Sequence, residues 1–427
     1  MEINLLENKD AYIILKKAKN SRDFLMRLSA LTDEKLVKGE TLIFFDEVQE
    51  CKEIVTAIKF LVEEGSFQYI LSGSLLGVDL KDIKSLPVGY MGVLRMYPLD
   101  FEEFLQALGV NTNIISNLKE CFEKEIPVDE FVNEKILSLY HLYLMIGGMP
   151  RVVQSYVENN NLNSVLTEQN TVLALYKKDI AKYDATNKLK IEDAFNLIPS
   201  ELNSKNKRFV VKDISPKANF SLNAIYDTFL WLKESGVGLP TFCVDEPVVP
   251  LLLSKKKNLF KLFLSDIGLL AALYGKDSQL SLLKEELNIN FGAIYENAVA
   301  QELQAHGYDL YYFCSKKQGE LDFLIEEKGK VVPIEVKSGK DYHRHNALSN
   351  VMKNPDYQIE KAYVLYNGNL KVENLEGKLL IDDSKVKKSK RIVYMPIYMT
   401  MFLDKTQLGT DLIYKVDIDS LNKYVGA

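Results

Sequence analysis

Two stretches of the sequence place acidic and basic side chains at spacings that suit metal-ion chemistry. The first is Thr41–Glu50, TLIFFDEVQE, in which Asp46 and Glu47 follow four consecutive apolar residues. An unbroken apolar run of this length predicts a strand buried on both faces of a parallel sheet. Open α/β sheets bind their ligands at the carboxyl ends of the strands, which is where these two carboxylates would lie.

The Asp46–Glu47 pair has the form of a Walker B element. In such an element Asp46 would hold Mg²⁺, directly or through water, and Glu47 would orient and deprotonate the attacking water. Judged alone, a core strand that merely ends in an acidic turn is the slightly favoured interpretation, because short apolar runs before acidic residues are common.

The next apolar stretch, Tyr69–Leu71, predicts a second buried strand and is followed by small polar residues. Ser72 and Ser74 flank a glycine at the end of this strand. In an ATPase sheet this is the sensor 1 position, where a polar side chain contacts the γ-phosphate or the attacking water. Both serines are therefore candidate cofactor-binding residues, although a plain turn after a strand explains the stretch equally well.

The second chemical stretch, GELDFLIEEKGKVVPIEVKSGK, lies in the C-terminal third of the chain. Its alternating apolar residues and the turn residue Gly329 predict a β-hairpin. Residues two apart in a strand point to the same face, so Glu335 and Lys337 lie together, and Asp322 can face them from the neighbouring strand. Two carboxylates at such a position suit Mg²⁺ or Mn²⁺.

Together with Glu296 in a preceding helical pattern, this arrangement resembles the PD-(D/E)XK nuclease superfamily. In the chemistry that the resemblance implies, Asp322 and Glu335 bind the metal and Glu296 supports its ligand shell. Lys337 would lower the pKa of the attacking water or stabilise the pentavalent phosphate. The pattern is more specific for the fold than for activity, because a glutamate and a lysine on one face can form only an ion pair.

Several ordered motifs resemble the bacterial and archaeal AAA-family ATPases that carry a C-terminal domain of unknown function. The motifs are LIFFDEVQE, YILSGSLLG, SLPVG with MYPLDFEEFL, GGMPRVV, YKKDIAKY and KLFLSDIGLLAAL. The resemblance covers nearly the whole chain and implies ATP and Mg²⁺ as cofactors. The family's Walker A loop, GxxxxGK[ST], is not found, so we expect ATP binding to be impaired. A truncated gene model, a wrong start codon and a degenerate paralogue all explain this departure.

The segments between the two chemical stretches predict helices and a small DNA-binding fold. Residues 106–190 have helical patterning, and residues 191–280 resemble a winged helix whose recognition helix could enter a DNA major groove. Solvated lysines on a packing module are the slightly favoured alternative. The candidate DNA contacts are Lys205, Lys207, Arg208, Lys212, Lys217 and Lys255–Lys257.

The composition is that of a globular protein without a global basic field. The 427 residues are 47% apolar and 26% charged, and the net charge is −6. The four cysteines lie far apart, which suits a reducing cytoplasm and argues against a zinc site or a disulfide framework. Neither a signal peptide nor an apolar run of roughly 18 residues is found, so we expect a cytoplasmic protein with no membrane partner.

Taken together, these patterns predict an α/β protein in four parts. Residues 1–105 form an incomplete AAA-type P-loop ATPase sheet, 106–190 a helical lid, 191–280 a winged helix, and 281–427 a PD-(D/E)XK-like α/β domain. The expected function is that of an ATPase-family protein acting on or near DNA. Two alternatives stay open, a Mg²⁺-dependent DNA endonuclease with a vestigial ATPase module and a non-enzymatic DNA-binding or regulatory protein. The oligomeric state also stays open, a homo-oligomer included.

Overall fold

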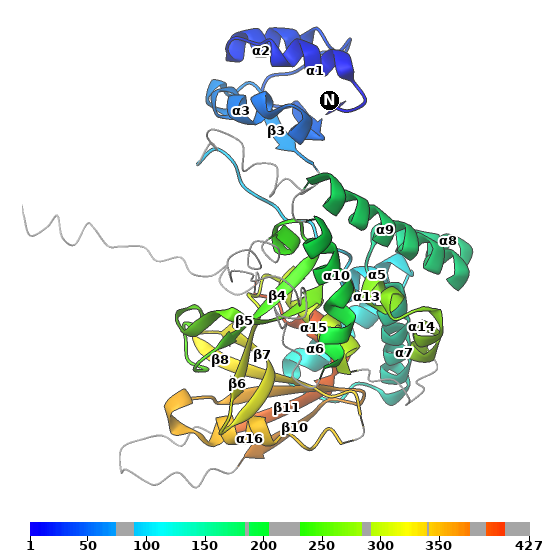
Figure 1. Cartoon of the computed structure of the whole chain (residues 1–427), viewed down its shortest axis with the longest axis vertical. Coiled ribbons are helices and arrows are strands. Elements are labelled where there is room, and N and C mark those ends of the chain that lie inside the picture. Colours follow the sequence, from blue (N-terminus) through cyan, green and yellow to red (C-terminus); the bar gives the residue numbers. More distant parts are fainter. Residues whose placement is uncertain are drawn as a thin grey trace, which may run out of the picture. The chain divides into compact units, whose positions relative to one another are not determined.

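The chain divides into two compact units, one for each chemical stretch. The first unit comprises residues 1–96 and 230–237, and the second comprises 97–229 and 238–427 (Figure 1). Asp46 lies in the first unit and Asp322 in the second. The computed structural model describes residues 1–73, 89–183, 188–204, 231–283, 292–339, 341–375 and 390–405.

The N-terminal unit contains a three-stranded parallel sheet. Its strands β1 (Glu2–Asn4), β2 (Leu42–Asp46) and β3 (Gln68–Leu71) lie in that order, so the strand that ends at Asp46 is central. The register places Asn4 beside Asp46, which brings the carboxyl ends of β1 and β2 together. This part of the sheet has the parallel pairing that the buried apolar strands predicted.

Three helices share a core with one face of this sheet. They are α1 (Lys9–Lys16), α2 (Ser21–Ser29) and α3 (Lys52–Glu64). The Asn20 side chain accepts the backbone N–H of Asp23 and caps α2. Gly65 ends α3 in the left-handed conformation with φ 74°. The core residues of the helices pack with Ile43 and Phe45 of β2.

The strand β2 is buried on one face only, so the prediction of burial on both faces was wrong. Ile43 and Phe45 are inaccessible, whereas Leu42 is 42% exposed. The burial predicted for Tyr69–Leu71 was wrong too, because Ile70 is 47% exposed. Successive side chains of a strand alternate between faces. The described helices pack with Ile43 and Phe45, so side chains of the opposite face lie at the surface of the described unit.

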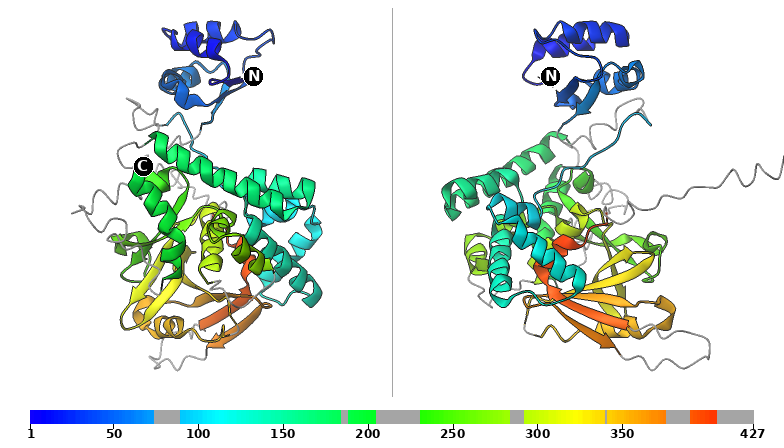
Figure 2. Two further views of the ribbon diagram at one scale, coloured as in Figure 1. Left: turned by 45° about the vertical axis from the view of Figure 1, so that its right-hand side comes forward. Right: turned by 180° about the vertical axis from the view of Figure 1, so that it is seen from behind.

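The second unit begins with helices, which confirms the helical patterning of residues 106–190. None of the helices that the structure describes has the length and apolar character of a membrane span. Figure 2 shows the helices of this region lying together on one side of the unit and the strands on the other. The helices are α5 (Phe101–Ala107), α6 (Thr112–Lys124), α7 (Glu130–Ile146), α8 (Pro150–Asn159), α9 (Leu162–Tyr183) and α10 (Lys188–Asn203).

The break between α7 and α8 is a close contact that requires glycine. Gly147 has φ +79°, and a Cβ there would come within 2.4 Å of the Asp266 Oδ1 atom. Asp266 begins α13 (Ile267–Leu273) and accepts the backbone N–H groups of Gly148 at 2.6 Å and Leu269 at 2.9 Å. A buried carboxylate therefore joins the end of α7 to the start of α13.

An eight-stranded mixed sheet forms the centre of the second unit. Its order is β10-β11-β9-β8-β7-β6-β4-β5, and the pairs β4–β6, β8–β9 and β9–β11 are parallel. α14 (Lys276–Leu283), α15 (Gly292–Ala305) and α16 (Asn346–Lys353) complete the unit, and α15 is buried from Ala293 to Leu303. The strands are β4 (Gly238–Val244), β5 (Lys255–Leu264), β6 (Tyr311–Ser315), β7 (Gly319–Glu327), β8 (Lys330–Val336), β9 (Lys361–Tyr366), β10 (Lys371–Leu375) and β11 (Lys390–Pro396).

The hairpin formed by β4 and β5 belongs to this sheet, which changes the interpretation of residues 191–280. Lys255–Lys257, expected in a wing, begin β5 at the edge of the sheet, and β4 pairs in parallel with β6. The sheet therefore continues across the domain boundary that we expected at residue 280. The expected recognition helix begins outside the described residues. The candidate DNA contacts from Lys205 to Lys217 also lie outside them.

Candidate functional site

Asp46 lies where the carboxyl ends of the three N-terminal strands meet. Its Oδ2 atom accepts a hydrogen bond from the side chain of Asn4, the last residue of β1, at 2.8 Å. Its Oδ1 atom accepts one from the Ser72 hydroxyl, just after β3, at 2.5 Å. The structure thus brings together two of the residues that we expected to hold a nucleotide and its metal. Ser74 lies outside the described residues.

Glu47 follows Asp46 in an uncommon backbone conformation. It has φ 54° and ψ 44°, the left-handed region, and its N–H donates to the Asp46 Oδ1 atom at 3.0 Å. Its carboxylate accepts a hydrogen bond from the Gln49 side chain. A non-glycine residue in this region costs of the order of 1 kcal/mol, and Glu125 and Asn160 adopt the same conformation at helix ends.

Asp322 and Glu335 face each other on neighbouring strands of the C-terminal sheet. β7 and β8 pair with Phe323 opposite Ile334, so Asp322 and Glu335 take the next pair of positions. The Val336 N–H donates to the Asp322 Oδ2 atom at 2.9 Å. The Lys337 Nζ atom is 3.3 Å from the Glu335 Oε2 atom. The hairpin therefore assembles the three residues that the sequence placed on one face.

The two carboxylates lie close enough to perturb each other. Burial raises the pKa of Glu335 well above its usual range, and the Asp322 carboxylate raises it further, while Lys337 acts in the opposite direction. Glu335 is only 4% exposed. A buried carboxylate next to a partly buried one is stable only with a proton or a cation close by, so the pair suits a divalent metal.

Lys261, which the sequence analysis did not single out, lies in the same cluster. Its side chain is completely buried, and its Nζ atom lies 2.8 Å from the Glu320 Oε1 atom and 3.7 Å from the Glu296 Oε2 atom. Burial lowers the pKa of Lys261, but the neighbouring carboxylates outweigh burial and raise the pKa above its usual value. The sequence feature that could have indicated this buried lysine is its position between Phe260 and Leu262 in an apolar strand pattern.

The net charge of this carboxylate cluster suits one divalent cation. Four carboxylates and two ammonium groups, all ionised, carry two net negative charges, which one such cation would offset. Glu296 contributes from α15 and is 2% exposed, so it needs a fixed cationic partner. The cluster consists of Glu296, Glu320, Asp322, Glu335, Lys261 and Lys337.

Three family models match separate parts of the chain. A model described as an AAA domain matches residues 2–105, and two models of domains of unknown function, DUF8612 and DUF4143, match residues 137–280 and 291–382. These matches support an AAA-family protein that carries domains of unknown function. The mixed α/β structure with parallel strands agrees with an AAA-type fold. Asp46 and Glu47 fall within the AAA match and the pair Asp322 and Glu335 within the DUF4143 match.

Two curated mycobacterial proteins are similar to part of the chain. They are uncharacterized protein Rv2008c of Mycobacterium tuberculosis and uncharacterized protein Mb2031c of Mycobacterium bovis. Each is 29% identical over 110 residues, which is 25% of this chain and 24% of the relative. The matched segment thus spans about a quarter of either relative, and both names leave the function open.

Proposed function

We propose that the C-terminal unit of this AAA-family protein is a metal-dependent nuclease of the PD-(D/E)XK type that acts on DNA. The observation that carries the proposal is the pairing of Asp322 with Glu335 across β7 and β8, with the Lys337 ammonium 3.3 Å from Glu335. Carboxylates from neighbouring strands next to a lysine are the residues that the nuclease resemblance requires. The short distances among Asp322, Glu335 and Lys337 therefore support the proposal.

In this proposal each residue of the cluster has a separate task. Asp322 and Glu335 hold a Mg²⁺ or Mn²⁺ ion, and Glu296 supports its ligand shell from α15. When bound there, a divalent ion would supply activation of a water molecule and offset charge on the phosphate. Lys337 is the partly exposed cation, with 25% of its side chain accessible, so it is available to a phosphate oxygen or to the attacking water. Lys261 is inaccessible and fixes Glu296 and Glu320 instead.

A plasmid-cleavage assay with Mn²⁺ tests the proposal. We expect the wild-type chain to nick or linearise DNA and Lys337→Ala to lower the rate at least a hundredfold, because the variant loses the cation that faces the phosphate. Lys328→Ala is the matched control, since Lys328 lies in the exposed turn of the same hairpin. Equal rates for wild type and Lys337→Ala would refute the assignment. Salt-dependent DNA binding without cleavage would favour the regulatory alternative.

A second function, Mg²⁺-dependent nucleotide binding in the N-terminal unit, is favoured by the contacts of Asp46. Asn4 and Ser72 hold its carboxylate at the point where three parallel strands end, which is where such sheets bind ligands. In this proposal Asp46 holds Mg²⁺ and Glu47 orients the attacking water. Titration of the chain with a fluorescent ATP analogue and Mg²⁺ tests it. Asp46→Asn should weaken the Mg²⁺-dependent part of binding at least tenfold, and Glu50→Gln should leave it unchanged.

A further inference from the structure

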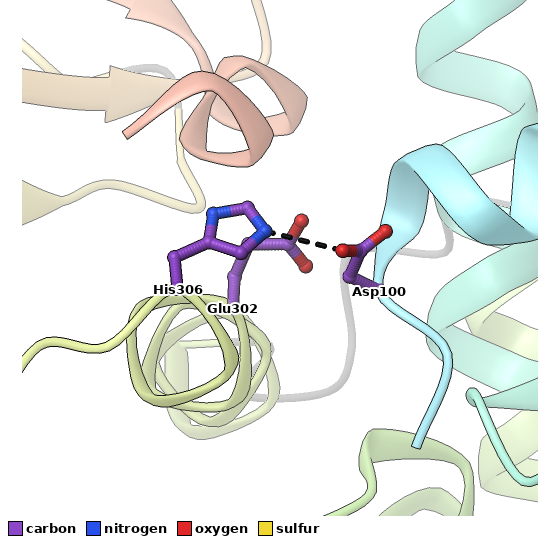
Figure 3. Close-up of side chains that lie close together, drawn as sticks. All are labelled: Asp100, Glu302 and His306. Carbon is purple, nitrogen blue, oxygen red and sulfur yellow. Dashed lines mark hydrogen bonds and ion pairs between the residues drawn. The ribbon is translucent and has the colours of Figure 1, made fainter. Parts of the chain in front are cut away.

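Three potential metal ligands meet where α5 and α15 come together. Asp100 immediately precedes α5, Glu302 lies in the last turn of α15, and His306 follows that helix. One ligand atom from each residue lies within 4.8 Å of the other two (Figure 3). The three residues belong neither to the Asp46 site nor to the carboxylate cluster, so the functions proposed above do not explain them.

The hydrogen bonds of His306 fix which ring nitrogen can bind a cation. Its Nδ1 atom lies 2.9 Å from the Leu403 carbonyl oxygen, which can only accept, so Nδ1 carries a proton. Its Nε2 atom faces the Asp100 Oδ2 atom at 3.1 Å. Histidines that bind metals commonly donate their other ring N–H to a carbonyl, which holds the ring in place. Two ligands at about 2.1 Å from one cation lie roughly 3–3.5 Å apart, which matches this spacing.

Glu302 supplies an independent indication that a cation belongs here. The residue is 3% exposed, and within the part of the chain that the structure describes its two oxygens share one hydrogen-bond donor, the Phe101 N–H, at 3.3 and 3.4 Å. An ionised carboxylate offers about four acceptor positions, so a buried carboxyl group with so little hydrogen bonding needs a proton or a cation beside it. Figure 3 shows this carboxylate directed toward Asp100, alongside the ring of His306.

We propose that Asp100, Glu302 and His306 bind one divalent cation of the Zn²⁺ class. One imidazole nitrogen with two carboxylates is a donor set for Zn²⁺ or Co²⁺, unlike the all-oxygen set offered by Asp322 and Glu335. The side chains of Asp100 and His306 are 18% and 12% exposed, so a water molecule can complete the coordination. Because Asp100 caps α5 and the other two ligands come from the C-terminal end of α15, the cation ties these two helices together.

Co²⁺ titration of the chelator-treated full chain, in excess Mg²⁺, tests the proposal. The Asp46 site and the carboxylate cluster contain no histidine among their proposed ligands, so a histidine signature in the Co²⁺ spectrum distinguishes this site from those two. We expect one Co²⁺ per chain at this site and one paramagnetically shifted, exchangeable proton, that of His306 Nδ1. One equivalent of Zn²⁺ should remove this signal.

Variants then separate a metal site from an ordinary ion pair. His306→Gln should abolish the shifted proton, and Glu302→Gln should weaken Co²⁺ binding at least tenfold while keeping an acceptor for the Phe101 N–H. His343→Gln is the matched control, because His343 is exposed and distant in sequence from the three ligands. Glu302→Gln decides the question if His306→Gln fails to fold. Absence of the shifted proton in the wild type, its presence in His306→Gln, or an unchanged Co²⁺ affinity of Glu302→Gln would overturn the proposal.

Discussion

Replacing Lys261 by methionine keeps the length of the side chain and removes its buried charge. The Lys261 Nζ atom lies 3.7 Å from Glu296, and both side chains are at most 3% exposed. With an effective dielectric constant of about 20, unit charges at this separation attract by roughly 4–5 kcal/mol. The desolvation of the lysine offsets part of that attraction in the wild type. After the substitution Glu296 is left buried without this cation, so we expect the free energy of unfolding to fall by about 3–5 kcal/mol.

Native-state hydrogen exchange is the assay that isolates this unit. The amides of β7 and β8 report the stability of the sheet around Lys261, whereas a bulk unfolding curve would mix the two units. Lys256→Met is the matched control, because Lys256 begins the same strand and pairs at 2.5 Å with Asp245. The side chains of that pair are 35% and 61% exposed. A pair so accessible to water contributes about 0–1 kcal/mol, so the control should lose little stability.

A double variant tests whether the loss arises from the orphaned carboxylate. Adding Glu296→Gln to Lys261→Met removes the charge that the first substitution leaves behind, and we expect it to recover about 1–3 kcal/mol. Glu320 needs no such rescue, because its side chain is 30% exposed and water can solvate it. The reasoning is refuted if Lys261→Met costs no more than Lys256→Met, or if the second substitution adds its own loss instead of recovering stability.

Two further predictions concern Asp266, which joins the end of α7 to the start of α13, and Gly148, which packs against Leu99. Burial raises the pKa of Asp266 to about 6, above its value in an unfolded chain, so the folded state binds this proton more tightly. Stability should therefore fall by about 3 kcal/mol as the pH rises from about 4 to 6, and then level off. Asp266→Asn should lack that component when the hydrogen exchange of the α13 amides is measured at each pH, and identical profiles would contradict the assignment. Gly148→Ala would place a Cβ 2.0 Å from the Leu99 carbonyl oxygen, so we expect a loss of at least about 3 kcal/mol. Gly339→Ala, which meets nothing within 4 Å, is its calorimetric control, and equal melting temperatures would refute the steric argument.

The face of the C-terminal hairpin that carries Asp322, Glu335 and Lys337 was predictable because its determinants are local. Alternating apolar residues and Gly329, which has φ 74°, specify two strands joined by a tight turn. The period of two then places Glu335 and Lys337 on one face, and the short turn brings Asp322 opposite. No long-range contact is needed for this inference, so the sequence alone was sufficient.

Lys261 was not predictable in the same way, because its surroundings come from distant parts of the chain. It reaches Glu296 and Glu320 only after β4 pairs with β6, and that pairing joins residues such as Val244 and Phe313. Local sequence periodicity does not indicate which distant strands pair. The same limit explains β2, whose apolar run could not reveal that helices pack with Ile43 and Phe45 while Leu42 is exposed.

The meeting of Asp100 with Glu302 and His306 was likewise beyond the sequence. Asp100 lies about two hundred residues before Glu302 and His306. It reaches them only through the docking of α5 against the end of α15. Scattered cysteines argued against a zinc site, but that argument applies to sites built from cysteine. A site built from one histidine and two carboxylates has no compact sequence signature, so the structure is needed to find it.

The measurement that tests the account most directly is a Mn²⁺ binding isotherm for Glu335→Gln compared with wild type. Both chains should carry Asp46→Asn and Glu302→Gln, which weaken the two other proposed metal sites, and Glu123→Gln on the exposed face of α6 is the control. We expect the Glu335→Gln chain to lose one Mn²⁺ site, or to bind Mn²⁺ there at least tenfold more weakly, because one of the two paired carboxylates is gone. If the Glu335→Gln chain gave the same isotherm as the chain that keeps Glu335, the result would contradict a metal site at Asp322 and Glu335, and with it the proposed nuclease.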